Sequence, residues 1–444
     1  MKLRSTAFLL LVAGFGGTLF DFGGTVIAPA IPYFEALGTF TAAEISRLTS
    51  AVVLSAAISC FLTGFLADQI GRKPTMVLAA FLALAATFSI CLSNGAFAPF
   101  YVGRFLQGLA AGMIGVVVPM YFVETLPTEA RGKGAAVFQL LDIIGIFLCS
   151  LVGIAVVRFL GAADDAAVSI VAKTRAWQVI FASSAVPATL FLLGTLFLPE
   201  SPVWLSRTSR TSRSTQTTSQ TLFQRKYVLP FVLAVVVLMC NQGTAVTSLQ
   251  YYAVKLFQDA GLSNALANTL NGFTMALFCG ATALALPLVD RVGRRPLMLV
   301  GTAGIVLCHL TASGMFFAMS HGLLSPGFGT GLAVAAAIAG VIFFFGMGPG
   351  VVAWLFLSEL MPNRIRAVGM SVAMFFNMVV AYLIADQLLL VGAHHGFAPM
   401  FFLFAASSAV YFLTTVFFLP ETKGRTLAEV ERMWEGKSRK ECDV

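Results

Sequence analysis

The chain of 444 residues is 58% hydrophobic and only 11% charged, whereas soluble domains are roughly 45–50% apolar and about 25% charged. A water-soluble fold could not bury this much apolar surface, but a bilayer passage needs only about 20 apolar residues, and such runs recur along the chain. The net charge of +8 does not indicate nucleic-acid binding, because the basic residues form short clusters between apolar runs.

The predicted elements are apolar runs bounded by charges or by Gly, Pro and Asn. In chain order they lie near 7–30, 48–67, 75–94, 97–120, 134–157, 177–198, 227–253, 266–289, 297–318, 330–357, 367–391 and 397–419. These runs are too long and too uniformly apolar for barrel strands, so they predict an all-α membrane protein with twelve transmembrane helices. The first run resembles a signal peptide, but it continues to Ile31 without a convincing cleavage site and is interpreted as the first transmembrane helix.

The basic residues predict the orientation. With twelve spans both termini lie on one side, and 22 of the 28 Lys and Arg then fall on that same side. They lie in the segments 1–6, 68–74, 124–133, 199–226, 290–296, 359–366 and 420–444. Because basic loops stay in the cytoplasm, we expect both termini to be cytoplasmic. The absence of Asn-x-Ser/Thr acceptor sites and the short loops favour a bacterial inner membrane over another plasma membrane.

The longest polar segment divides the chain into two halves. We expect an N-terminal six-helix bundle over 1–200, a cytoplasmic linker over 201–226, a C-terminal six-helix bundle over 227–420 and a cytoplasmic tail over 421–444. The linker is rich in Ser, Thr and Arg, which is typical of a solvated segment near anionic lipid headgroups.

The two halves repeat one another at three places. Asp68 to Pro74 returns as Asp290 to Pro296, Glu124 with Arg131 returns at the same spacing as Glu359 with Arg366, and Pro199-Glu-Ser returns as Pro420-Glu-Thr. A carboxylate at a helix end can bond an arginine or a helix terminus in one conformation and release it in another. These residues therefore predict a cytoplasmic latch made of Asp68, Arg72, Glu124, Arg131, Asp290, Arg294, Glu359 and Arg366. For the basic members the alternative is a simple topology anchor.

Together with three further motifs, these repeats resemble the sugar porter family of the major facilitator superfamily. The motifs are Tyr-x-x-Glu-x-x-Pro-x-x-x-Arg-Gly at 121–132, Pro-Glu-Ser-Pro-x-x-Leu at 199–205, and Gly348-Pro349-Gly350 followed by Trp354. The resemblance covers nearly the whole chain. It implies two pseudo-symmetric bundles that rock about a central site for a sugar or sugar-like polyol within the lipid bilayer.

Four ionisable residues fall inside the spans, where such groups are costly and usually functional: Asp21, Arg104, Asp142 and Asp386. At about 1.5 Å per residue, Asp21 lies about 13 Å and Arg104 about 10 Å below the outer surface, so the two could pair. The resemblance implies that Asp21 is the proton acceptor of a symporter and Arg104 its partner. A static ion pair that fixes helix packing is the alternative. Asp386 is expected to reach the outer water, and Asp142 either faces the cavity or pairs elsewhere.

Neutral hydrogen-bonding side chains are dense in the seventh span, and amides can donate to and accept from sugar hydroxyls without adding charge. With the positions that the resemblance implies, the expected solute contacts are Gln139, Asn241, Gln242, Thr247, Tyr251, Trp354 and Asn377. Tyr251 and Tyr252 are either interface aromatics or an outer gate.

Departures from the family pattern bear on the solute. Phe278, Ile146 and Thr247 replace three customary polar groups, so the site is expected to be more apolar than that of a hexose carrier. Uniport, or transport of another small polar solute such as a polyol or an organic acid, is the main alternative, and a sugar sensor would need a longer signalling tail. The four histidines have no evident nucleophile or metal partner, so neither an enzyme nor a cofactor or metal is expected.

Overall fold

The computed structural model describes residues 6–126, 128–209, 225–360 and 366–423, and these residues form helices with no strand among them. In chain order the helices are α1 (Thr6–Thr25), α2 (Ile31–Leu37), α3 (Ala42–Ile70), α4 (Arg72–Leu92), α5 (Phe97–Thr125), α6 (Thr128–Leu160), α7 (Ile170–Ala182), α8 (Ala185–Leu196), α9 (Pro202–Ser209), α10 (Arg225–Gly243), α11 (Val246–Asp259), α12 (Asn264–Val292), α13 (Arg294–Ser320), α14 (Phe328–Met347), α15 (Pro349–Leu360), α16 (Arg366–His395) and α17 (Ala398–Phe417). Twelve helical segments in this part of the chain are long and apolar enough to cross a bilayer. The prediction of an all-α protein with twelve transmembrane helices is confirmed.

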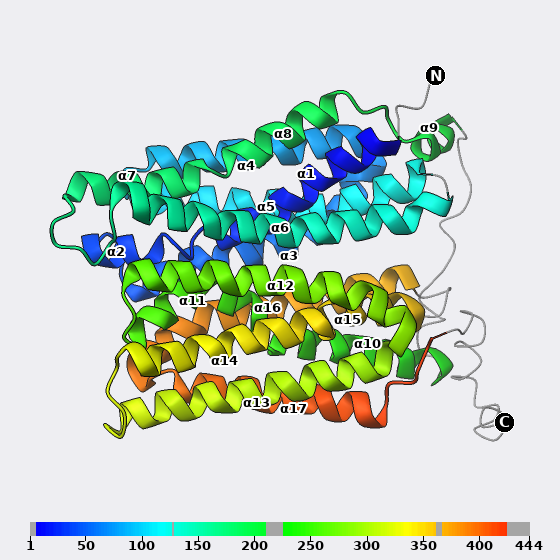
Figure 1. The fold of residues 1–444 in the computed structure, drawn as a ribbon. Helices are drawn as coiled ribbons and strands as arrows, with labels where there is room; N and C mark the ends of the chain where they lie inside the picture. The colour runs from blue at the N-terminus through cyan, green and yellow to red at the C-terminus, as the bar shows by residue number, and fades with distance from the viewer. Residues whose placement is uncertain (1–5, 127, 210–224, 361–365, 424–444) are drawn as a thin grey trace.

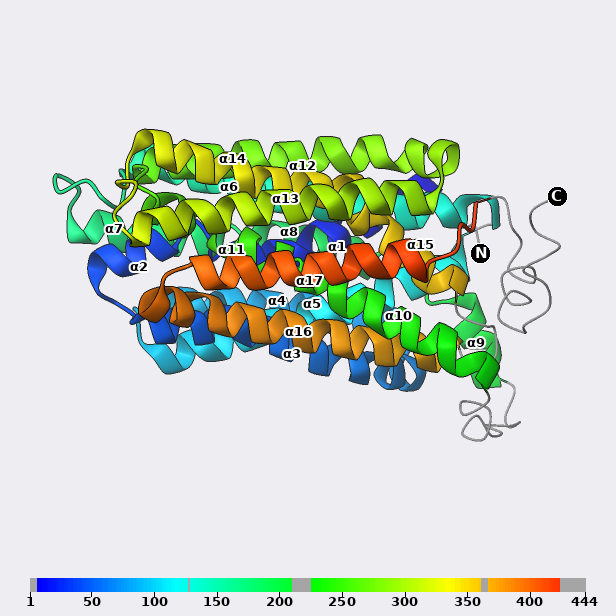
Figure 2. The same ribbon diagram turned by 90° about the horizontal axis from the view of Figure 1, so that it is seen from below.

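The helices run side by side along one common direction. Helices α1 to α8 lie together on one side, and α10 to α17 lie together on the other (Figure 1). The start of α1, the end of α17, the helix α9 and the α3–α4 and α12–α13 turns all lie at one end, called here the basic end. The far end, with α2 and the start of α7, is called the opposite end (Figures 1 and 2).

The two halves meet along pairs of long helices. Helix α3 packs against α16, α6 packs against α12, and α11 contacts both α1 and α2. A continuous cluster of buried apolar side chains extends across this boundary near the opposite end, from Phe34 and Phe181 in the first half to Tyr252 and Phe401 in the second. Packing therefore joins the halves most fully at the opposite end.

Several predicted spans are interrupted helices. The first ends at Thr25, and a short turn leads into α2. The seventh is divided into α10 and α11 at Ala245, whose φ of 58° is left-handed and strained for a residue with a Cβ. The tenth is divided into α14 and α15 at Gly348. Hydropathy could not reveal the breaks in the seventh and tenth spans, because each falls inside a single segment that is apolar enough to cross a bilayer.

The structure describes only the two ends of the predicted linker over 201–226. Helix α9 occupies its first residues and continues to Ser209, although the sequence shows no helical pattern after Leu205. Residues 210–224 and the tail beyond Lys423 lie outside the described residues. The proposed domain boundaries therefore remain a prediction.

Candidate functional site

A polar cluster lies beside the break between α10 and α11. The Thr247 hydroxyl donates to the Gln242 side-chain carbonyl at 3.0 Å, and the Gln242 amide donates to Oδ1 of Asn377 at 3.4 Å. The Asn377 amide in turn donates to the Leu238 carbonyl at 2.8 Å. Gln242 and Thr247 are partly exposed, so their polar atoms can be reached by a solute. Asn377 is fully buried and fixes the Gln242 side chain through its hydrogen bond. The structure brings together three of the seven predicted solute contacts.

The other predicted contacts are placed differently. Asn241 is 3% exposed, and its amide donates to the Pro349 carbonyl at 3.2 Å, where it ties α10 to the start of α15. Trp354 on α15 is 38% exposed and offers a broad apolar surface. Gln139 is half-buried on α6. Asn241 therefore holds the backbone around the second helix break in this conformation.

A histidine supports the break in the seventh span. His309 on α13 is fully buried, and its Nε2 lies 3.0 Å from the Thr244 carbonyl, which the interrupted helix leaves without its usual partner. The sequence showed that His309 has no catalytic partner but gave no sign of this structural role.

Both tyrosines of α11 are buried, which argues against interface aromatics. The Tyr252 hydroxyl donates to the Ala385 carbonyl at 2.8 Å. Tyr251 is 3% exposed and lies across the boundary between the halves, since a methyl group added at Gly24 of α1 would meet its hydroxyl at 2.7 Å. Tyr251 also interacts electrostatically with Asp21, Arg104 and Asp142. One residue of the second half thus faces the charged groups of the first.

Arg104 is buried and caps the end of α1. Its guanidinium donates to the carbonyls of Gly23 at 2.6 Å, Gly24 at 3.3 Å and Leu48 at 3.0 Å, and to the Gln107 side chain at 2.8 Å. The carbonyls of Gly23 and Gly24 are orphaned because α1 stops at Thr25, and a cation favours the negative end of a helix. No ion pair between Arg104 and Asp21 is present among the described residues. Their pairing remains a prediction for another state of the protein.

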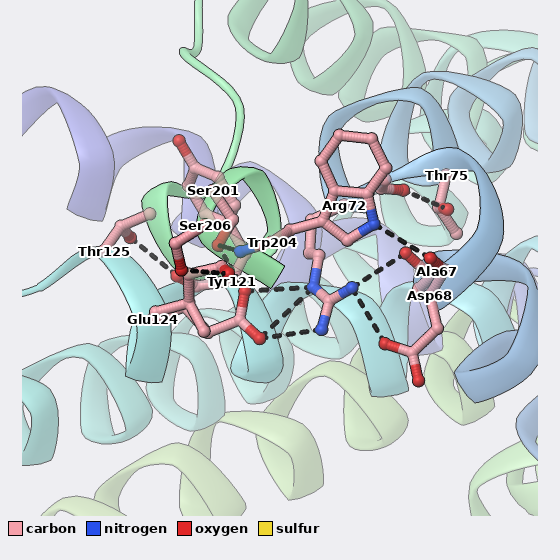
Figure 3. Close-up of polar contacts among 12 residues, drawn as sticks. Ala67, Asp68, Arg72, Thr75, Tyr121, Glu124, Thr125, Ser201, Trp204 and Ser206 are labelled. Atoms are coloured by element: carbon pink, nitrogen blue, oxygen red, sulfur yellow. Dashed lines mark hydrogen bonds and ion pairs between the residues drawn. The ribbon is translucent and has the colours of Figure 1, made fainter. Parts of the chain in front are cut away.

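A buried ion network occupies the basic end of the first half (Figure 3). Arg72, 1% exposed, bonds Asp68 at 2.9 Å and forms a two-pronged contact with Glu124, with its Nη2 at 2.8 Å and its Nε at 2.9 Å. The Ser201 hydroxyl also bonds Glu124, and the Trp204 indole donates to the Asp68 carbonyl at 2.9 Å. The network joins α3, α4, α5 and α9, as the latch interpretation requires of the first half.

Glu200 was not among the predicted site residues, yet it completes this network. Its carboxylate accepts from the backbone amides of Arg72 at 3.0 Å and Lys73 at 3.2 Å, and so caps the start of α4. The turn before it requires glycine, because Gly71 has φ of 101° and a Cβ there would lie 3.1 Å from the Glu200 carboxyl carbon. The Pro-Glu repeat was the signal that could have identified Glu200.

The second half repeats this arrangement. Glu421 accepts from the amides of Arg294 at 3.1 Å and Arg295 at 3.0 Å, and Arg294 bonds Asp290 at 3.3 Å. The intervening Gly293 has φ of 109°, matching Gly71. The side chains of Arg131, Glu359 and Arg366 lie outside the described residues, so their part of the latch remains a prediction.

Glutamine in place of Glu421 is expected to destabilise the protein by about 1 kcal/mol at neutral pH, the usual scale of a helix cap. Partial burial acts to raise the pKa of Glu421, but amide donors from Lys423, Arg294, Arg295 and Thr422 outweigh it and lower the pKa below the ordinary 4.5. A lowered pKa stabilises the folded state above that ordinary value, and this gain disappears as pH falls through the lowered pKa. Melting temperatures of both proteins between pH 7 and pH 4 should converge as pH falls, and a constant difference would contradict the assignment.

Direct polar contacts join the two halves near the opposite end, and the sequence did not predict them. Asp386 on α16 accepts from the Ser50 hydroxyl of α3 at 3.0 Å, and its backbone carbonyl accepts from Ser46. Lys255 on α11 bonds Glu35 on α2 at 3.0 Å. The Asn264 backbone N–H at the start of α12 donates to the Asp164 carboxylate at 2.8 Å. Asp386 thus contacts the other half as well as lying near the surface, and the opposite end is closed in this structure.

A cross-link between cysteines at Ser50 and Asp386 is expected to hold the opposite end closed. In a background without the seven native cysteines, a short bis-methanethiosulfonate cross-linker, which forms a disulfide with each cysteine, should abolish movement of solute through the protein, and a reductant that cleaves these disulfides should restore it. Each single-cysteine variant treated in the same way is the control. Unchanged flux in the fully cross-linked protein would show that this contact does not open.

The fold and the site define a class of protein. Two sets of spanning helices enclose interrupted helices, amides and buried ionisable groups near their boundary, and the charged motifs are repeated at one end, which is the architecture of a secondary transporter. The protein is therefore a multi-pass membrane protein with the architecture of that class.

More particularly, the chain belongs to the family described as Sugar (and other) transporter, whose model matches residues 9–222 and 207–434. It is 25% identical over 467 residues to the arabinose-proton symporter of Bacillus subtilis (strain 168), covering 98% of this chain and 96% of that protein. It is 28% identical over 430 residues to the facilitated glucose transporter member 2 of Sus scrofa, covering 88% of this chain and 78% of that protein. The inward-open structure of the xylose transporter XylE from E. coli superposes with a TM-score of 0.79 at 22% identity, covering 96% and 99% of the two chains. The predicted family is confirmed, and that family is one of transporters.

Proposed function

We propose that the protein moves a sugar or sugar-like polyol across the membrane by alternating access, together with a proton. The relatives support a sugar and a proton, because one of them is an arabinose-proton symporter. The observation that carries the proposal is the position of Tyr251. It follows Gln242 and Thr247 along the interrupted seventh span and faces Asp21 and Arg104 across the boundary. Solute bound at the amides would therefore change, through Tyr251, the surroundings of Asp21 and Arg104.

The two halves would supply different parts of the cycle. The first half contributes the acid Asp21 and the cation Arg104, and the second contributes Gln242, Asn377 and the exposed face of Trp354. An aromatic face suits the apolar side of a sugar ring, and amides suit its hydroxyls. Gln139 would approach the solute from α6, and Asn241 would approach it from α10, the helix that also carries Gln242.

The direction of access follows from the contacts between the halves. We propose that the basic end faces the cytoplasm, so this structure, closed at the opposite end, is closed toward the outside. The segments 1–200 and 227–420 would then rock as two bodies, breaking the Asp386 and Lys255 contacts to admit solute from outside. In the conformation that is open to the outside, the repeated acid and arginine motifs would close the basic end.

Uptake by proteoliposomes tests the proposal. Labelled pentoses, hexoses and polyols are offered with and without an inward proton gradient, with protein-free vesicles as the control. At least one should accumulate above its outside concentration, and a protonophore should reduce it to equilibrium. Equilibration that ignores the gradient would identify a uniporter, and failure of every sugar and polyol would reject the solute class.

A further inference from the structure

Helices α1 and α6 are in unusually close contact where two acidic residues lie. A methyl group added at Gly145 would meet the Thr18 Cα at 2.9 Å, and one added at Gly17 would meet the Asp142 backbone nitrogen at 3.2 Å. The Thr18 hydroxyl also donates across the contact to the Leu141 carbonyl at 3.2 Å. Glycines that let backbones approach this closely place Asp21, one turn beyond Gly17, beside Asp142.

Asp142 is buried without a complete set of partners. The residue is 6% exposed, and its Oδ1 has no hydrogen-bond partner among the described residues. The carboxyl reaches the backbone of Asp21 and interacts with the Asp21 carboxyl as a like charge. A buried carboxylate oxygen without a partner costs folding free energy unless a proton or a hydrogen-bond donor binds to it.

The nearby cation does not neutralise the two acids in this conformation. Arg104 directs its donors to the carbonyls at the end of α1 and to Gln107, and no ion pair to Asp21 or Asp142 is present in the described part of the chain. The other titratable groups around the pair are Tyr251 of α11, Cys149 of α6 and Cys279 of α12, and α8 carries no ionisable residue. None of these supplies a positive charge.

We propose that Asp142 and Asp21 form one proton-sharing carboxyl pair, in which Asp142 is a second proton-binding residue of the transporter. Two neighbouring carboxylates in a poorly hydrated site cannot both ionise, so the pair keeps one proton. The two acids share this proton, and it provides a partner for Oδ1 of Asp142. This inference rests on the proposed proton symport. Under this proposal the proton is bound between residues of two helices, α1 and α6. A shift of one helix relative to the other would therefore change the affinity of the pair for the proton.

Infrared titration of the purified full-length protein tests the pair without requiring transport. The wild type should show the C=O band of a protonated carboxylic acid at neutral pH, and removal of the like charge should move the titration of this band. In Asp142→Asn the remaining acid should titrate at least about one pH unit lower, a tenfold change in protonation. Asp386→Asn is the matched control, because that acid bonds Ser50 and Gln387 and should leave the band unchanged.

The outcomes separate this inference from the proposed function. A band that titrates identically in wild type and Asp142→Asn, or that is absent from the wild type, overturns the pair even if proteoliposomes accumulate sugar. A shifted band supports the pair even if no proton-driven uptake is found. If Asp142→Asn does not fold, Asp142→Glu keeps the acid but changes its reach, and an unmoved titration in that variant also overturns the proposal.

Discussion

Asparagine in place of Asp21 is expected to abolish accumulation of solute against its gradient while preserving exchange of labelled for unlabelled solute. The amide keeps the size of the side chain but cannot bind and release a proton, so the gradient no longer drives the cycle. The ratio of inside to outside solute should fall to one under an inward proton gradient. Exchange needs only the solute-loaded protein to reorient, and it should continue.

The experiment is decided by comparing both activities in the same vesicles. Asp386→Asn is the control, since Asp386 also lies within a span but bonds Ser50 and Gln387 rather than the proton pair. It should keep its dependence on the proton gradient. Undiminished uphill uptake by Asp21→Asn would refute the assignment of Asp21, and loss of exchange as well would show that Asp21 is needed for reorientation and not only for proton coupling.

Alanine in place of Arg72 is expected to destabilise the first half and to stop transport. Arg72 is 1% exposed and is the shared partner of Asp68, Glu124 and the Ala67 carbonyl (Figure 3). Removing one side of a buried ion pair leaves the other charge unpaired and typically costs about 3–5 kcal/mol. For a bundle of this size, at about 2–4 °C per kcal/mol, the melting temperature should fall by on the order of 6–20 °C.

Two control variants show that burial rather than charge sets this effect. Asp68→Asn removes a carboxylate whose side chain is 63% exposed, and Asp290→Asn removes its counterpart, which is 80% exposed. Exposed pairs contribute about 0–1 kcal/mol, so both variants should melt close to the wild type. An Arg72→Ala protein with unchanged melting temperature and uptake would show that the network is not needed for either.

Some of the predicted site residues lie together in the structure, and others have a different role there. Gln242, Thr247 and Asn377 come together in space, since the density of neutral polar groups in an apolar span is visible in the chain itself. Asn241 turned toward the Pro349 carbonyl, because the break after α14 exposes an acceptor that only the folded chain reveals. Glu200 and Glu421 were missed as helix caps although their motif was recognised, since a repeat identifies a residue without identifying its donor.

The sequence by itself determined the number of spans, the duplication of the two halves and the family, because hydropathy, length and ordered motifs are properties of the chain. It also located Asp21, Arg104 and Asp142 along their helices. Depth along a helix is only one coordinate, however, and it does not specify which side of the helix a residue occupies or which helix lies beside it. Only the tertiary structure placed Asp142 next to Asp21, directed Arg104 to the end of α1 and closed the opposite end through Asp386 and Lys255, because each contact depends on the rotation and neighbours of packed helices.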